Sequence, residues 1–140
     1  MNDLNKAKSL LKENVTLALV KGEKVITSEK RGVAPLLEII DSSVDVKGFS
    51  CADKVVGRGA SYLYAILCVK KVFAQVLSEP AKKIFDKYGI DYEYSQLVPF
   101  IENRNKTGVC PMEQVTQNAT DKIDALNKIK EKVLQLKKEK

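Results

Sequence analysis

The chain has 140 residues, 44% of them hydrophobic and 30% charged, which is enough to bury the core of one domain spanning residues 1–140 and excludes a disordered chain. The net charge is +6, but the last twenty residues supply half of this excess, seven Lys against four acids. This mixed distribution argues against a nucleic-acid-binding stripe. The odd number of three cysteines favours a reducing compartment over a secreted disulfide scaffold.

The sequence contains no histidine, which excludes Ser-His and Cys-His catalysis and imidazole ligands for zinc. The first residues lack the apolar core of a signal peptide, and no apolar run is long enough to cross a membrane. We therefore expect a cytoplasmic protein that makes no membrane contact.

The patterns along the chain predict a three-layer α/β/α sandwich with a mixed sheet of four or five strands. After an amphipathic helix at residues 2–11, residues 15–20 form a nearly continuous apolar run, which is typical of a central strand buried on both faces. A turn at 21–24 returns the chain as a hairpin strand at 25–27. The remaining predicted elements are a short helix after Gly32, a strand at 72–77, a helix from Glu79-Pro80 to Gly89, a strand from Ile90, and a last helix at 123–136.

We predict that the most informative helix begins at Ser50. Ser50 and Asp53 have the spacing of a capping box, and apolar residues recur at helical intervals up to Leu67. Cys51 then lies in the first turn, where free amides and the helix dipole favour a thiolate. A small buried thiol beside the cap is the alternative interpretation of Cys51.

Three small residues, Gly57, Gly59 and Ser61, keep one side of this predicted helix slim. They permit close packing either on the helix's own sheet or against a second copy of the chain, and on the second alternative we expect a homodimer or a larger assembly. Because Gly57-Arg58-Gly59 falls inside the predicted helix and lacks a Walker lysine, we do not expect it to be a phosphate loop.

Two further helix starts, at Glu79-Pro80 and Cys110-Pro111, add candidate site residues. In an open α/β sheet, ligands collect beyond the carboxyl ends of the strands, where helix N-termini offer amides to anions. Glu79 can instead serve only to cap its own helix, and Cys110 can be no more than a small residue packed at a helix entry. We predict that Cys51 and Glu79 lie at one cleft, which Cys110 joins only if the loop after Ile101 crosses back over it. The candidate ligand-binding residues are Ser50, Glu79 and Glu113, and the candidate catalytic residues are Cys51, Asp53 and Cys110.

Some of these segments resemble cytidine deaminases. Cys51-Ala52-Asp53-Lys54 is similar to the Cys/His-Ala-Glu-Arg signature of their active-site helix, and residues 76–81 resemble the approach to their P-C-x-x-C motif. Over most of its length, including residues 108–113, the chain resembles a small prokaryotic family of unknown function with a cytidine-deaminase-like fold. The resemblance implies a mixed sheet between helices, in agreement with the order of the predicted elements.

The resemblance implies a site without the deaminase metal. By position, Cys51 matches the first zinc ligand and Asp53 the proton-shuttling Glu, but no thiolate remains between Pro80 and Ile84. With two ligands missing, we expect no metal and no cofactor. A mixed site of Cys51 and Cys110 with Asp53 or Glu79 is the remaining way to hold zinc.

These observations support three functions, which we rank in order. The first is a zinc-free deaminase-like domain that binds a small anionic or nucleotide-like ligand where helix N-termini converge. The second is a thiol-dependent enzyme with Cys51 or Cys110 as nucleophile, because a helix terminus can activate a thiolate without histidine. The third is a nucleic-acid or protein interaction module that uses the Lys-rich last helix, although its mixed charges fit a solvated helix packed on the domain better. Whether the chain is an enzyme stays open at this stage.

Overall fold

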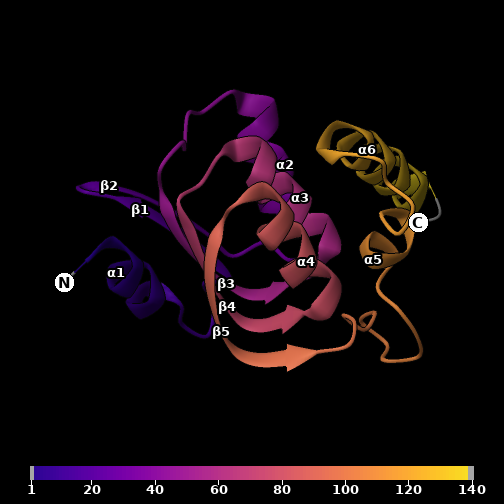
Figure 1. Ribbon diagram of the computed structural model, residues 1–140, viewed down its shortest axis with the longest axis horizontal. Coiled ribbons are helices and arrows are strands. Elements are labelled where there is room, and N and C mark those ends of the chain that lie inside the picture. The colour runs from indigo at the N-terminus through magenta and orange to yellow at the C-terminus, as the bar shows by residue number, and fades with distance from the viewer. Residues whose placement is uncertain (1, 139–140) are drawn as a thin grey trace.

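The computed structural model describes residues 2–138 and shows a five-stranded mixed sheet between helices (Figure 1). Along the sheet the strand order is β2-β1-β3-β4-β5; β1 is antiparallel to β2 and β3, whereas β3, β4 and β5 are parallel. This is the three-layer α/β sandwich that the sequence predicts. The elements are α1 (Asp3–Leu10), β1 (Leu17–Lys21), β2 (Lys24–Ser28), α2 (Ala34–Ser42), β3 (Ser50–Val56), α3 (Arg58–Leu67), β4 (Lys71–Ser78), α4 (Glu79–Tyr88), β5 (Asp91–Val98), α5 (Pro111–Val115) and α6 (Lys122–Lys138).

The sheet buries apolar side chains on both of its faces. Leu17 and Leu19 of β1 belong to the larger core, which includes residues of α2, α3 and α4. Ala18 and Val20 point to the opposite face, where they pack with Leu4 of α1. The continuous apolar pattern of β1 therefore does mark burial on both faces, although β3 and not β1 is the central strand.

The predicted helix start at Ser50 is wrong, because residues 50–56 form the strand β3. Cys51 lies opposite Leu19 of β1 and Val72 of β4, so the segment has backbone partners on both sides. The helix α3 begins only at Arg58, after Gly57 in an extended conformation. The apolar residues of β3 happen to continue the helical spacing of α3, and the neighbouring strands decide between the two structures.

The helix α4 follows its predicted course. Its N-cap Ser78 accepts a hydrogen bond on Oγ from the amide of Ala81 at 3.2 Å, and Pro80 occupies the first turn. The helix ends at Gly89, whose φ of 71° is left-handed. These local signals, all visible in the sequence, fix both ends of α4.

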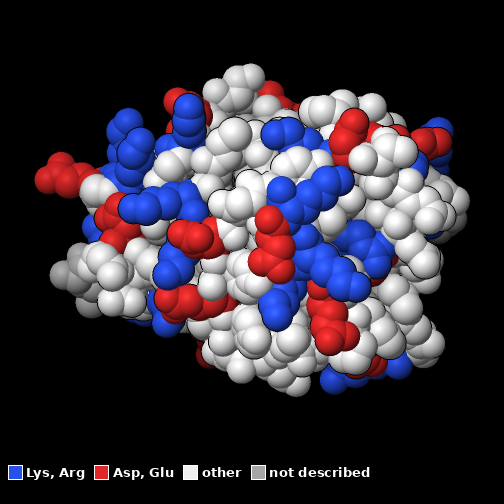
Figure 2. Space-filling model, in the orientation of Figure 1, with Lys and Arg blue, Asp and Glu red and all other residues white. Residues whose placement is uncertain are grey.

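The last helices, α5 and α6, lie beside α3 and away from the strands (Figure 1). Ile129 of α6 belongs to the larger core, and Lys130 forms an ion pair with Asp41 of α2 at 3.0 Å. The Lys-rich α6 is thus an amphipathic helix packed on the domain, and acidic and basic side chains are intermixed on the face shown in Figure 2. Between residues 2 and 138, no helix combines the length and the apolar character needed to cross a membrane.

Candidate functional site

Three helices begin at the same edge of the sheet. β2, β3 and β4 run in one direction, because β1 is antiparallel to both β2 and β3, and β3 is parallel to β4. Their carboxyl ends lead into α2, α3 and α4, respectively. Of the predicted helix starts, only the one at Glu79-Pro80 is among these three; α3 begins with Gly57 and Arg58, not with Ser50 and Cys51, and α2 was not predicted to take part.

The carboxylate of Glu113 covers the first turn of α3. Glu113 is only 2% exposed, and its Oε1 accepts a hydrogen bond from the amide of Arg58. Its Oε2 accepts a hydrogen bond from the amide of Ile101 at 2.9 Å, and the Arg58 guanidinium donates to the main-chain oxygen of Glu113 at 3.0 Å. Because Gly57 has no side chain with which to cap α3, a distant residue supplies the negative charge that a helix N-terminus favours.

The side of α3 that carries Gly57 and Gly59 packs against α5 of the same chain. A Cβ atom at Gly57 would lie 3.0 Å from Cγ1 of Ile101 and 3.2 Å from Oε1 of Glu113, and one at Gly59 would lie 3.1 Å from Cβ of Met112. These glycines therefore serve neither the sheet nor a second copy of the chain. The expectation of a homodimer loses the support that we drew from them.

The context of Gly57-Arg58-Gly59 also differs from our prediction. The segment does connect a strand to a helix, as phosphate loops do, because Gly57 lies between β3 and α3 while Arg58 and Gly59 begin α3. It nevertheless lacks the Walker lysine, and the amide of Arg58 already binds Glu113. The backbone at this turn is thus suited to an oxyanion and is occupied by one from within the chain.

A second group of titratable side chains lies inside the fold, between β3 and α3. Asp53 is 9% exposed, and its Oδ2 accepts a hydrogen bond from the Tyr64 hydroxyl at 2.7 Å. Burial raises the pKa of Asp53 to about 7, despite the hydrogen bonds from Tyr64 and from main-chain amides, which lower it. Burial, together with the charge of Asp53, raises the pKa of the Cys51 thiol well above its usual value.

Cys51 is therefore a neutral thiol in the core. It is fully buried, in the middle of the sheet, and its Sγ is 3.9 Å from the main-chain oxygen of Phe49. The predicted place of Cys51 in a first helical turn is wrong, because its segment is a strand. Both its burial and its raised pKa oppose a nucleophilic role.

Cys51 and Glu79 do not meet at one cleft, and the other candidate residues are also dispersed. Ser50 is buried at the amino end of β3, Cys51 and Asp53 lie in the core, and Glu79 is exposed at the start of α4. Cys110 is half-buried before α5, and its amide donates to the main-chain oxygen of Ile101 at 2.8 Å. Only Glu113 reaches the start of α3, and within residues 2–138 no three Cys, Asp or Glu side chains are grouped as a metal site requires.

A family model described as a domain of unknown function (DUF1893) matches residues 5–133. The chain belongs to this family. A crystal structure of a family member from Thermotoga maritima has a TM-score of 0.82 and 23% sequence identity, covering 94% of this chain and 91% of that one, so the two share a fold. A dCMP deaminase from the cyanophage S-TIM5 is similar at a TM-score of 0.44 and 17% identity, covering 57% of this chain and 79% of that one. No curated protein matches the sequence.

In this member of the DUF1893 family, the two deaminase-like segments have different structures. The segment Cys51 to Lys54, which resembles an active-site helix, is a strand, so the correspondence of its residues with that helix does not hold. Residues 76–81 do lead from a strand into a helix, as the resemblance implies. The chain therefore has the strand and helix start that precede the P-C-x-x-C motif, but residues 80–84 contain no cysteine.

Sequence reasoning missed the partners of these groups. Tyr64 is eleven positions after Asp53, on a different element, and no short motif marks the pair. The contact of Glu113 with Arg58 joins positions 55 residues apart. The only available signal was the pair of glycines around Arg58, which indicates that something approaches this turn closely.

Proposed function

We propose that the domain binds a small anionic ligand at the start of α3, in the position that the Glu113 carboxylate occupies. The observation that carries this proposal is the convergence of two main-chain amides, from Arg58 and Ile101, on one buried carboxylate. The carboxylate or phosphate group of a small molecule, including a nucleotide, offers the same acceptor oxygens.

The electrostatics of this edge support an anion. The dipole of α3 and the adjacent guanidinium of Arg58 both favour negative charge, and the chain as a whole carries a net charge of +6. The position, beyond the carboxyl end of β3, is where open α/β sheets bind ligands. Glu113 belongs to a helix of only five residues, so its carboxylate can yield its place with little loss of regular structure.

Replacing Glu113 tests the proposal. Glu113→Ala leaves the two amides without their acceptor, and we expect acetate or inorganic phosphate to raise its melting temperature at constant ionic strength. A ligand at a hundred times its dissociation constant stabilises the folded state by about 2.7 kcal/mol. The matched control is Glu102→Ala, which removes an exposed carboxylate from the same connecting segment.

A second variant covers the case in which Glu113→Ala does not fold. Glu113→Gln keeps the shape of the side chain but removes its charge, so phosphate and nucleoside monophosphates should bind it more tightly than they bind the wild type. If anions stabilise both Glu113 variants no more than the Glu102→Ala control, the proposal is wrong.

The other two functions receive less support. The thiol-dependent alternative is left with Cys110 alone, since Cys51 is buried. The interaction module based on α6 is opposed by the packing of this helix on the domain through Ala125 and Ile129.

A further inference from the structure

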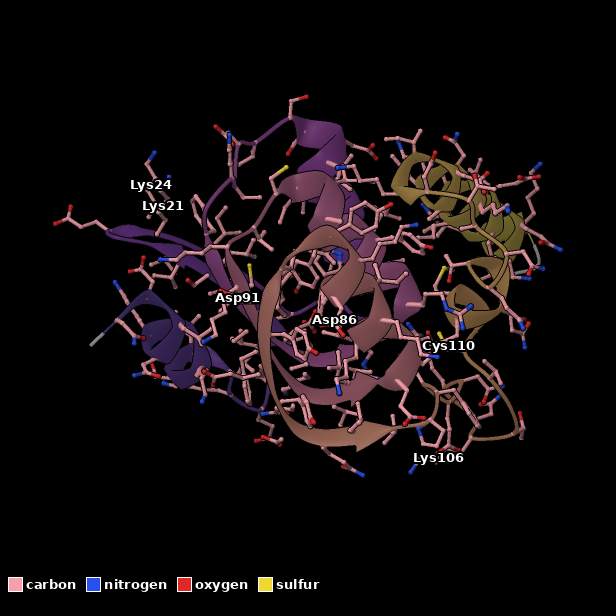
Figure 3. All side chains as sticks on the ribbon, viewed as in Figure 1. Lys21, Lys24, Asp86, Asp91, Lys106 and Cys110 are labelled. Atoms are coloured by element: carbon pink, nitrogen blue, oxygen red, sulfur yellow. The ribbon has the colours of Figure 1, made fainter. Side chains whose placement is uncertain are left out.

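A hollow of about 390 Å³ lies at the amino ends of the parallel strands, opposite to the end where α3 begins. It is placed between the end of α4 and the starts of β4 and β5. Its walls include Asp86, Asp91, Lys71 and the aromatic side chains of Phe85 and Tyr92. Figure 3 labels the two aspartates on the side of the molecule where α4 and β5 lie. This hollow is therefore separate from the start of α3.

The charges of this hollow favour a cation. Neither Asp86 nor Asp91 forms an ion pair with any residue that the structure describes. The lysine that lines the hollow, Lys71, pairs instead with Glu93 at 3.0 Å. The Oδ1 atom of Asp86 accepts only a hydroxyl hydrogen bond, from Tyr92 at 2.8 Å. The C-terminal end of α4, which carries partial negative charge, adds to the field of the two carboxylates.

Aromatic rings continue the hollow along β5. Tyr92 stacks on Phe85 with ring centroids 5.7 Å apart and on Tyr94 with centroids 6.5 Å apart. Tyr94 is 40% exposed, so one ring of this row is open to a partner. The faces of such rings attract guanidinium and ammonium groups, which makes arginine the side chain that best fits both the acids and the tyrosines.

The backbone beside the hollow is open as well. β5 is the last strand of the sheet, and within residues 2–138 it pairs only with β4. An edge strand presents unpaired amide and carbonyl groups to which an extended peptide can add.

We propose that β5 is a docking edge for an extended segment of another protein, whose basic side chain enters the hollow between Asp86 and Asp91. The backbone of β5 supplies hydrogen bonds to the segment, and the hollow selects its positive charge. A second copy of this chain is the less suitable occupant. A second β5 strand paired about a twofold axis would bring no positive charge to the hollow, because β5 (Asp91–Val98) contains no Lys or Arg. Pairing β2 of one copy with β5 of the next would repeat without closing and would build a filament.

Fluorescence anisotropy with a labelled peptide, Thr-Val-Arg-Val-Thr, tests the docking edge on the full chain. We expect saturable binding, and a loss of about tenfold in affinity when citrulline replaces the arginine. The double variant Asp86→Asn/Asp91→Asn should lose affinity by a similar factor, while its asparagines still accept hydrogen bonds. The control Asp45→Asn removes one exposed carboxylate from a loop and should bind as the wild type does.

Two further peptides test the backbone contribution, each N-methylated on one of the two alternate sets of amides. One of them should lose binding, because only one set faces the edge of β5. Several results would overturn the proposal: no binding of the arginine peptide, equal binding of the citrulline peptide, unchanged binding by the double variant, or equal binding of free argininamide. Self-association of the wild type that disappears in the double variant would assign the edge to a second copy and would also overturn it.

Discussion

Asp53 makes the stability of the domain depend on pH near neutrality. Its buried carboxyl has a pKa of about 7 in the folded chain, against 3.8 without the surrounding protein. The folded state therefore holds the proton more tightly than the unfolded state does. The resulting stability is complete at low pH, declines as the pH rises from about 4 to 7, and is absent above that range.

The size of this effect follows from the two pKa values. Each unit between them is worth 1.36 kcal/mol, which gives on the order of 4 kcal/mol in total, of which about 3 kcal/mol falls between pH 5 and pH 8. No histidine titrates in this pH range, because the chain contains none. The carboxylates with lowered pKa values, Glu93 and Asp124, lose their contribution only at lower pH.

The perturbation is Asp53→Asn, which removes the titrating group and keeps an oxygen that accepts the hydrogen bond of Tyr64. Urea unfolding followed by circular dichroism at pH 5 and pH 8 measures the free energy of unfolding. We expect the wild type to lose about 3 kcal/mol between the two pH values and the variant to change little. Asp45→Asn, at an exposed site, should keep the wild-type dependence. If the wild type is equally stable at both pH values, or if Asp53→Asn keeps its slope, the reasoning is refuted.

Three further predictions concern the start of α3 and the cysteines. Gly59→Ala should lower the free energy of unfolding by about 1–3 kcal/mol in urea titrations, because the new methyl group meets the Cβ atom of Met112. Glu113→Gln should cost about 1–3 kcal/mol in the same assay, since it replaces a buried carboxylate that accepts two amide hydrogen bonds, and an unchanged midpoint would contradict that role. A thiol reagent should modify the exposed Cys68 at once, whereas the buried Cys51 should react only as fast as the chain unfolds; rapid modification of a Cys68→Ser/Cys110→Ser variant would show that Cys51 is accessible.

The parts of the fold that the sequence predicts are those with local signals. The hairpin of β1 and β2 has a turn between apolar runs, and α4 has a serine cap, a proline and a terminal glycine. The error at Ser50 arose because the choice between strand and helix in residues 50–56 depends on β1 and β4, which flank that segment in space. No periodicity within a single segment reports such neighbours.

The candidate site was less predictable than the fold, because its contacts join distant residues. Glu113 was identified as a ligand-binding residue from its place after Cys110-Pro111, yet its partners Arg58 and Ile101 lie in other segments. Asp53 was identified through a helix that does not exist, and its actual partner, Tyr64, carries no sequence signal. The sequence shows which residues are able to titrate or bind, whereas their contacts with one another depend on the folded sheet that brings them together.

The bond between Glu113 and the first turn of α3 also sets an order for synthesis of the chain. All five strands and the helices between them are complete by Val98, before the segment that carries Glu113 has been made. A nascent chain that folds from its N-terminus therefore builds α3 while the amide of Arg58 still faces water. Docking of α5 is then a late event on an already formed sheet.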